Sequence, residues 1–235
     1  MTIADRPSPN FDARPAGGGI DLLILHYTGM RTALEALERL CDPAAKVSAH
    51  YLIDEDGTVA RLVAEEHRAW HAGVSSWRAR RDINAASIGI ELVNPGHEFG
   101  YRPFPEAQMA ALEALARGIL ARHPIPARHV LGHSDVAPLR KQDPGERFDW
   151  PRLARAGVGL WPDFAAARAP ATVADTQAAL AAIGYACPQS GALDAETAAA
   201  VAAFQRHYRP ERCDGVLDDE TGRRIATLAR ALASP

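Results

Sequence analysis

The sequence predicts an α/β protein with a mixed central β-sheet flanked by helices, followed by a small three-helix domain at the C-terminus. Two observations carry this prediction. Short apolar runs bounded by glycine and proline alternate with helical patterns through most of the first 160 residues, an order typical of a sheet covered by helices. The composition then changes, because 22 of the 71 residues from 165 to 235 are alanine, a strong helix former.

The first predicted elements lie within the N-terminal 41 residues. Residues 1–19 are rich in proline and glycine and predict an irregular arm. The apolar run Ile20–Tyr27 lies between glycines and predicts a buried strand. Thr32–Cys41 has leucines at helical spacing and stops before Pro43, which predicts a helix.

The rest of the predicted sheet follows between residues 47 and 132. Val47–Asp54 and Thr58–Val63 flank an acidic turn with a glycine, the pattern of a hairpin. Ser87–Val93 predicts a second buried strand and Ala127–Gly132 a shorter one. Between them, Glu106–Arg122 has apolar residues at helical spacing and ends before a proline, which predicts a long amphipathic helix.

The alanine-rich part predicts only helices. Its helical patterns cover residues 173–183, 195–208 and 219–232. We expect a first domain over residues 1–164, a linker over 165–171 and a three-helix domain over 172–235. A bundle of this size is viable alone but marginally stable.

Charge and cysteine content argue against several classes of protein. Lys and Arg total 26 and Asp and Glu total 29, which gives no support for a nucleic-acid partner or a polybasic membrane surface. No apolar run approaches the roughly 20 residues of a membrane span. The N-terminus lacks the pattern of a signal peptide, so we expect a cytoplasmic location and reduced cysteines, although Cys187 and Cys213 could pair. Three cysteines cannot form a four-thiolate zinc site.

Nine histidines are the main candidates for chemistry. His67/His71 and His129/His133 are each spaced four residues apart, which suits a shared zinc ion on a helix. His129 and His133 lie along a predicted strand, where four residues span about 13 Å, so they are not expected to be co-ligands. The segment around His67 and His71 has no sustained apolar helical face, and surface or groove histidines are the simpler interpretation.

His26 and His133 differ because each ends an apolar strand and precedes a small polar turn. Catalytic groups commonly lie where rigid elements open onto loops. Catalytic zinc takes three protein ligands and leaves a position for water, and Asp143 follows His133 closely enough for its loop to fold back as the third ligand. The spacing matches no local metal motif, so on spacing alone this trio is one interpretation among several.

Five motifs occur in order along the first domain. They are Leu25–Thr28, Val47–Asp54, Ala69–Ser75, Ser87–Asn94, and Gly132–Pro138 with Arg140–Gly145. Together they closely resemble the zinc-dependent N-acetylmuramoyl-L-alanine amidases of the AmpD/AmiD type (the amidase-2 family), over about residues 18–160. Residues 172–233, through the patterns around Gln177, Gly191 and Asp214, resemble the three-helix peptidoglycan-binding module.

The resemblance implies one Zn²⁺ ion held by His26, His133 and Asp143. Two neutral imidazoles and one carboxylate leave such a site with a net charge of +1, which suits polarisation of an amide carbonyl and activation of water. It also implies Glu91 as the general base that takes a proton from water and returns it to the leaving amine, with Lys141 stabilising the oxyanion.

The residues themselves give partial support to these two roles. Glu91 lies in a nearly all-apolar strand, where burial raises the pKa of a carboxyl group and an unpaired charge is costly; a structural ion pair is the alternative. For Lys141 the alternative is a solvated side chain, and the neighbouring Arg140 is a second candidate cation.

The resemblance also implies a substrate groove lined by aromatic and amide side chains. The residues concerned are Tyr27, Trp70, His71, Asn84 and Asn94. Aromatic rings can stack on a sugar or peptide plane, and amides can bond a peptide. Trp70 fits a core position equally well, and His50 can be either structural or part of the site.

The implied reaction is hydrolysis of the amide between N-acetylmuramic (or 1,6-anhydro-N-acetylmuramic) acid and L-alanine, in cell-wall turnover or recycling. The substrate would be peptidoglycan or muropeptide, with no obligate protein partner. The C-terminal helices would tether the enzyme to polymeric wall, so cleavage of small muropeptides is expected not to need them. Such a tether is the argument for the alternative location, the periplasm or cell envelope, beside the cytoplasmic location expected above. A peptidoglycan-recognition protein that binds without cutting and a zinc peptidase acting on the peptide stem are the alternatives.

Overall fold

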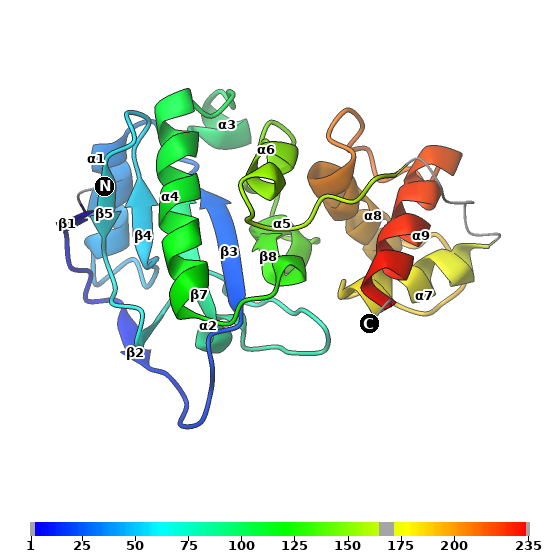
Figure 1. The fold of residues 1–235 in the computed structure, drawn as a ribbon, viewed down its shortest axis with the longest axis horizontal. Coiled ribbons are helices and arrows are strands. Elements are labelled where there is room, and N and C mark those ends of the chain that lie inside the picture. Colours follow the sequence, from blue (N-terminus) through cyan, green and yellow to red (C-terminus); the bar gives the residue numbers. More distant parts are fainter. Residues whose placement is uncertain (1–2, 165–171, 234–235) are drawn as a thin grey trace.

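The computed structural model describes residues 3–164 and 172–233 as two parts, a sheet covered by helices and a bundle of three helices (Figure 1). The strands are β1 (Ile3–Asp5), β2 (Phe11–Ala13), β3 (Leu22–Tyr27), β4 (Tyr51–Ile53), β5 (Val59–Arg61), β6 (His67–Ala69), β7 (Ser87–Leu92) and β8 (Val130–Gly132). The helices of the first part are α1 (Ala33–Cys41), α2 (Ile83–Ala86), α3 (Gly96–Phe99), α4 (Glu106–Arg122), α5 (His133–Val136) and α6 (Trp150–Arg155), with the 3₁₀ turn η1 (Ala127–His129). The bundle consists of α7 (Val173–Ile183), α8 (Ala195–Tyr208) and α9 (Asp219–Ala233). The predicted fold class is confirmed, and the expected linker, 165–171, lies outside the described residues.

Six strands form the main sheet in the order β1-β5-β4-β7-β3-β8. β3 pairs in parallel with both β7 and β8, β7 pairs in parallel with β4, and the predicted hairpin joins β4 and β5 in antiparallel. Both faces of β3 are buried, with Leu23 and Leu25 in one core and Leu22 and Ile24 in another. This burial on two sides explains why the strand reads as a continuous apolar run.

Helices cover the sheet on the faces that the apolar patterns predict. α4 crosses one face of the sheet (Figure 1), where Met109, Leu112 and Ile119 are buried in the same core as Leu25. α1 begins at the N-cap Thr32, whose side chain accepts a hydrogen bond from the backbone N–H of Glu35.

Two sequence predictions were wrong in part. The arm expected to be irregular contains β1, which pairs with β5, and β2, which pairs with β6 in a separate two-stranded sheet. Their residues are exposed, and edge pairing through the backbone leaves no apolar pattern to detect. The strand expected over Ala127–Gly132 begins only at Val130, because the carbonyl of Pro126 accepts the N–H of His129 and closes the turn η1 first.

The three-helix bundle shares a hydrophobic core with the first part. Leu22 and Val136 of the first part belong to one buried cluster with Leu180 and Phe204 of the bundle. The contact is close at Gly184, the C-cap of α7, where an added Cβ would lie 2.4 Å from the Trp77 ring. The two parts therefore pack as a continuous body.

Two further features bear on the sequence-based expectations. No helix in the described part of the chain is long and apolar enough to cross a membrane. Cys41, Cys187 and Cys213 all carry free thiols, so the last two do not pair.

Candidate metal centre and active-site pocket

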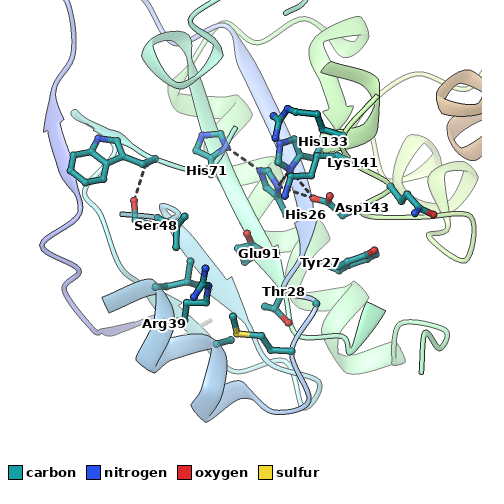
Figure 2. Close-up of a pocket in the computed structure, with 18 residues that line it drawn as sticks. His26, Tyr27, Thr28, Arg39, Ser48, His71, Glu91, His133, Lys141 and Asp143 are labelled. Atoms are coloured by element: carbon teal, nitrogen blue, oxygen red, sulfur yellow. Dashed lines mark hydrogen bonds and ion pairs between the residues drawn. The ribbon is translucent and has the colours of Figure 1, made fainter. Parts of the chain in front are cut away.

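Three side chains converge at the carboxyl ends of two neighbouring parallel strands. His26 lies in β3, His133 begins α5 directly after β8, and Asp143 lies in the loop that follows. Each pair among His26 Nδ1, His133 Nδ1 and Asp143 Oδ2 is 3.0 Å apart, and all three side chains are buried (Figure 2). Parallel strands bring their carboxyl ends to one edge of a sheet, which explains why residues 107 positions apart meet there.

The protonation states of this cluster suit a cation. Burial, followed by the charge of His133, lowers the pKa of His26 to about 4, so its imidazole is neutral at physiological pH. Burial alone would raise the pKa of Asp143, but the close approach of His133 and then of His26 outweighs this and lowers the pKa below its ordinary value, so the carboxyl group is ionised. Two imidazole nitrogens and one carboxylate oxygen facing a common point form a candidate metal site.

Glu91 faces the same pocket from the neighbouring strand. It lies in β7 directly opposite His26 in the sheet register (Figure 2). Its Oε2 atom is enclosed without a hydrogen-bond partner in the part of the chain that the structure describes. Burial and then the charge of Asp143 raise the pKa of Glu91 well above its ordinary value, and Lys141 partly offsets this. The carboxyl group is therefore suited to taking up and releasing a proton.

The structure separates the roles of two adjacent cations. The Arg140 guanidinium donates hydrogen bonds to the backbone carbonyls of Ala72 and Val74 and so holds the loop between them. Lys141 lies beside the three converging side chains and lines the pocket (Figure 2). Of the two candidates, Lys141 has the ammonium group that remains available to a ligand.

The converging side chains open into a cavity of about 370 Å³. Tyr27, Trp70 and His71, expected at a substrate groove, all line this cavity. The Tyr27 hydroxyl also lies 2.9 Å from His97 Nδ1, which holds the phenol ring in place. His71 has a second contact, 3.0 Å from its Nδ1 to Nε2 of His26, so it lies directly behind the first candidate ligand.

Asn84 and Asn94 do not line this cavity, contrary to expectation. The Asn84 side chain accepts hydrogen bonds from the backbone N–H groups of His71 and Ala72. The Asn94 side chain is fully buried, where it donates to the Arg102 carbonyl and accepts from the Gly96 N–H. The oxygen of Asn84 and both polar groups of Asn94 therefore support the backbone of loops at the edge of the sheet.

The remaining histidines lie outside the converging trio. His50 is fully buried, and its Nδ1 accepts the N–H of Gly89, so it has a structural role. Burial, followed by the charge of Arg14, lowers the pKa of His50 to about 3. His67 stacks on Phe11, and His129 bonds through Nδ1 to the carbonyl of Asp21, so neither i, i+4 pair shares a site.

Sequence reasoning missed two residues near this site. Arg39 of α1 lines the cavity and is exposed (Figure 2). Ser87, at the start of β7, bonds to His71. A signal for Arg39 existed in the sequence, because α1 follows directly on the strand that carries His26. Ser87 could have been found from strand alternation, which places it on the same face of β7 as Glu91.

Comparison with known proteins agrees with this geometry. A family model described as N-acetylmuramoyl-L-alanine amidase matches residues 16–146, and one described as a putative peptidoglycan binding domain matches residues 170–225. The N-acetylmuramoyl-L-alanine amidase AmiD of Escherichia coli K12 is 38% identical over 230 residues, which cover 89% of this chain and 82% of that protein. The 1,6-anhydro-N-acetylmuramyl-L-alanine amidase AmpD of Salmonella typhimurium SL1344 is 38% identical over 171 residues, 66% of this chain and 89% of that protein.

Solved structures extend the likeness over both parts. The complex of Escherichia coli AmiD with the substrate anhydro-N-acetylmuramic acid-L-Ala-D-γ-Glu-L-Lys matches with a TM-score of 0.81 and 36% identity, over 93% of this chain and 91% of that one. AmpDh3 of Pseudomonas aeruginosa matches with a TM-score of 0.81 and 36% identity, over 94% of this chain and 96% of that one. The resemblance seen in the sequence motifs is confirmed: this chain belongs to the N-acetylmuramoyl-L-alanine amidase family.

Proposed function

We propose that this protein is a zinc-dependent N-acetylmuramoyl-L-alanine amidase that cleaves muropeptides. The observation that carries the proposal is the convergence of His26, His133 and Asp143 in one cavity with Glu91 and Lys141. A solved structure of AmiD, a relative with the same fold over more than nine-tenths of the chain, is a complex with an anhydromuramyl peptide as substrate. The scissile bond would be the amide between the lactyl group of the sugar and L-alanine.

The donor set fits zinc. Two imidazole nitrogens and one carboxylate oxygen, with a side open to the cavity, correspond to catalytic zinc sites that have three protein ligands. Magnesium and calcium prefer all-oxygen sets, which this site does not offer. When bound, the ion would supply Lewis-acid polarisation of the amide carbonyl and acidification of water.

Glu91 and Lys141 would handle the proton and the charge of the reaction. Glu91 accepts a proton from the attacking water on a carboxylate oxygen and later delivers it to the alanine nitrogen, so its raised pKa suits both steps. Lys141 places its positive charge beside the position where the carbonyl oxygen becomes negative. Tyr27 and Trp70 would offer ring faces and edges to the sugar and the peptide.

The C-terminal bundle would bind polymeric wall. Its family model is described as a peptidoglycan binding domain. We propose the division into a catalytic domain over 1–164, a linker over 165–171 and a binding domain over 172–235. Because the bundle shares a core with the first part, it would hold polymer at a fixed position relative to the cavity.

The test compares three substrates with the same zinc-loaded enzyme: an anhydromuropeptide, its non-anhydro counterpart and intact sacculi. Mass spectrometry of the products is expected to show free muramyl sugar and an intact peptide stem. Shortened stems still attached to sugar would identify a peptidase instead. Binding with no product from any substrate would identify a recognition protein.

A further inference from the structure

A chain of hydrogen bonds runs away from the candidate metal centre into the sheet. His26 Nε2 lies 3.0 Å from His71 Nδ1, and His71 Nε2 lies 3.0 Å from Ser87 Oγ. The Ser87 hydroxyl then donates to the backbone carbonyl of Ile83 at 2.7 Å. The three side chains in this hydrogen-bonded series are all buried. The series ends on the Ile83 carbonyl in α2, the short helix directly before β7.

The last acceptor fixes the direction of every bond. A backbone carbonyl can only accept a hydrogen bond, and a serine hydroxyl has one hydrogen to donate. Because the Ser87 hydroxyl donates that hydrogen to the Ile83 carbonyl, it can only accept a hydrogen bond from His71. His71 must then carry its proton on Nε2, which leaves Nδ1 as the acceptor for the Nε2–H of His26. A neutral His26 with its proton on Nε2 has a free lone pair on Nδ1, the atom that faces His133 and Asp143.

The tautomer of His133, the second candidate ligand, is set by a single hydrogen bond. His133 Nε2 lies 3.0 Å from the backbone carbonyl of Ala72, which can only accept, so His133 also presents a lone pair on Nδ1. Ala72 directly follows His71, and the side chain of Asn84 accepts the backbone N–H groups of both. One short segment, His71–Ala72, therefore contacts the rear nitrogen of each histidine ligand.

The strand behind His71 is shaped to hold this ring. Ser87, Gly89 and Glu91 alternate along one face of β7. A Cβ at Gly89 would lie 2.5 Å from the His71 ring, closer than real atoms approach, so only glycine leaves room for the imidazole. On this face of β7, Ser87 therefore bonds the His71 ring, Gly89 leaves space for it, and Glu91 supplies the carboxyl group of the pocket.

We propose that His71 and Ser87 are positioning residues that set the tautomer and orientation of the metal ligand His26, with Asn84 holding the segment that carries His71. This rests on the proposed metal site and assigns His71 a role other than the substrate contact expected from the resemblance. Groups behind a ligating histidine typically change metal affinity 10- to 100-fold when they are removed.

The first experiment needs no variant. Long-range ¹H–¹⁵N correlation spectra of the full chain, recorded without and with one equivalent of zinc, report which ring nitrogen of each histidine carries the proton. The expected result is His71 protonated on Nε2 in both states and His26 protonated on Nε2 in the zinc-loaded state, with its Nδ1 shifted by metal. A His71 ring protonated on Nδ1, or zinc bound to His26 through Nε2, would overturn the proposal.

The second experiment measures zinc affinity by competition with a chromophoric chelator. Ser87→Ala and His71→Ala are expected to weaken zinc binding 10- to 100-fold, while His71→Gln recovers part of the loss because its amide oxygen can accept from His26. The matched controls are Ser75→Ala, whose hydroxyl donates to the Gly73 carbonyl, and His67→Ala, which lies outside the trio. Zinc affinities within twofold of the native protein in both Ser87→Ala and His71→Ala would refute the inference.

These readouts separate the inference from the proposed function. A protein that binds zinc with the expected tautomers but leaves muropeptides intact would contradict the amidase activity and support the role of His71. If the protein cleaves muropeptides and the variants Ser87→Ala and His71→Ala keep full zinc affinity, the amidase activity is supported and the role of His71 is contradicted.

Discussion

Asp135 of α5 accepts a hydrogen bond from Nδ1 of His207 in α8 at 2.7 Å, and both side chains are completely or almost completely buried. The other oxygen of the carboxylate accepts the Tyr185 hydroxyl at 2.7 Å. The Gly132 N–H also donates to Asp135, directly before the candidate ligand His133. The bundle therefore satisfies a buried charge within the short helix that begins at the candidate metal site.

This relationship predicts a large stability effect for His207→Ala. Removing one partner of a buried charge leaves the Asp135 carboxylate short of a donor and opens a cavity beside Trp150, on which the His207 ring stacks at 3.6 Å. The expected loss is about 3 kcal/mol or more in the free energy of unfolding, measured by urea denaturation. Arg206→Ala, the neighbouring residue in α8, is the control and is expected to change it little. Equal stability of the two variants would contradict the argument.

Deletion of residues 170–235 is predicted to destabilise the catalytic part itself. The deletion would expose Leu22, Ile24 and Val136, which share a buried cluster with the bundle, and would leave Asp135 without two of its donors. This differs from the expectation, drawn from the sequence, that cleavage of small muropeptides does not need the bundle. Thermal unfolding and muropeptide hydrolysis of the truncated chain test it. A stable, fully active fragment would show that the interface is dispensable.

Glu91→Gln is predicted to lower kcat on a muropeptide by 10²- to 10⁴-fold, because the amide cannot take up a proton from water. Zinc content is expected to remain at one ion per chain, since Glu91 is not one of the three converging ligands. The melting temperature is expected to stay the same or rise, because the enclosed Oε2 atom has no partner among the described residues. Undiminished hydrolysis would remove Glu91 from the mechanism.

Metal removal is predicted to abolish hydrolysis and to lower thermal stability reversibly. A ligand that binds only the folded state adds about 2.7 kcal/mol at a free concentration of 100 times its dissociation constant. Dialysis against a chelator followed by addition of zinc is expected to remove and restore both activity and the higher melting temperature. Asp143→Ala should lose the zinc-dependent rise in melting temperature, whereas a variant that keeps this rise would exclude Asp143 as a ligand.

Acid is predicted to destabilise the fold through Glu65. Burial alone would raise its pKa, but hydrogen bonds from Arg122, His123 and Tyr51 outweigh this and lower the pKa to about 2. A pKa lower in the folded than in the unfolded state stabilises the fold above about pH 4.5, and this contribution is lost as the pH falls towards 2.

The check is the pH dependence of unfolding for Glu65→Gln. The side chain of Glu65 is 15% exposed, so the contribution at neutral pH is expected to approach about 3 kcal/mol. Glu65→Gln should lose most of this at pH 7 and flatten the acid limb of the stability curve between pH 5 and 2. Glu66→Gln, the exposed neighbour, provides the control, and an identical acid limb in both variants would contradict the assignment.

The sequence by itself determined the elements whose signal is local or whose motif is specific. β3 and β7 are mostly apolar because nearly all of their residues are buried, and α4 has the residues its helical periodicity predicts. The motifs also identified the family and the trio His26, His133 and Asp143. Residue-by-residue resemblance supplied that trio, because spacing alone could not join a strand residue to one 107 positions away.

Tertiary structure decided everything that depends on which groups a fold brings into contact. It moved Asn84 and Asn94 from the expected groove to backbone support, and it placed His71 behind His26 with Ser87 as its anchor. The arm carries no apolar strand pattern, because the edge pairing of its exposed strands uses only backbone groups. The buried contact between Asp135 and His207 was likewise beyond prediction, because hydrogen bonds between distant segments leave no periodic trace in a chain and form only once packing has fixed their partners.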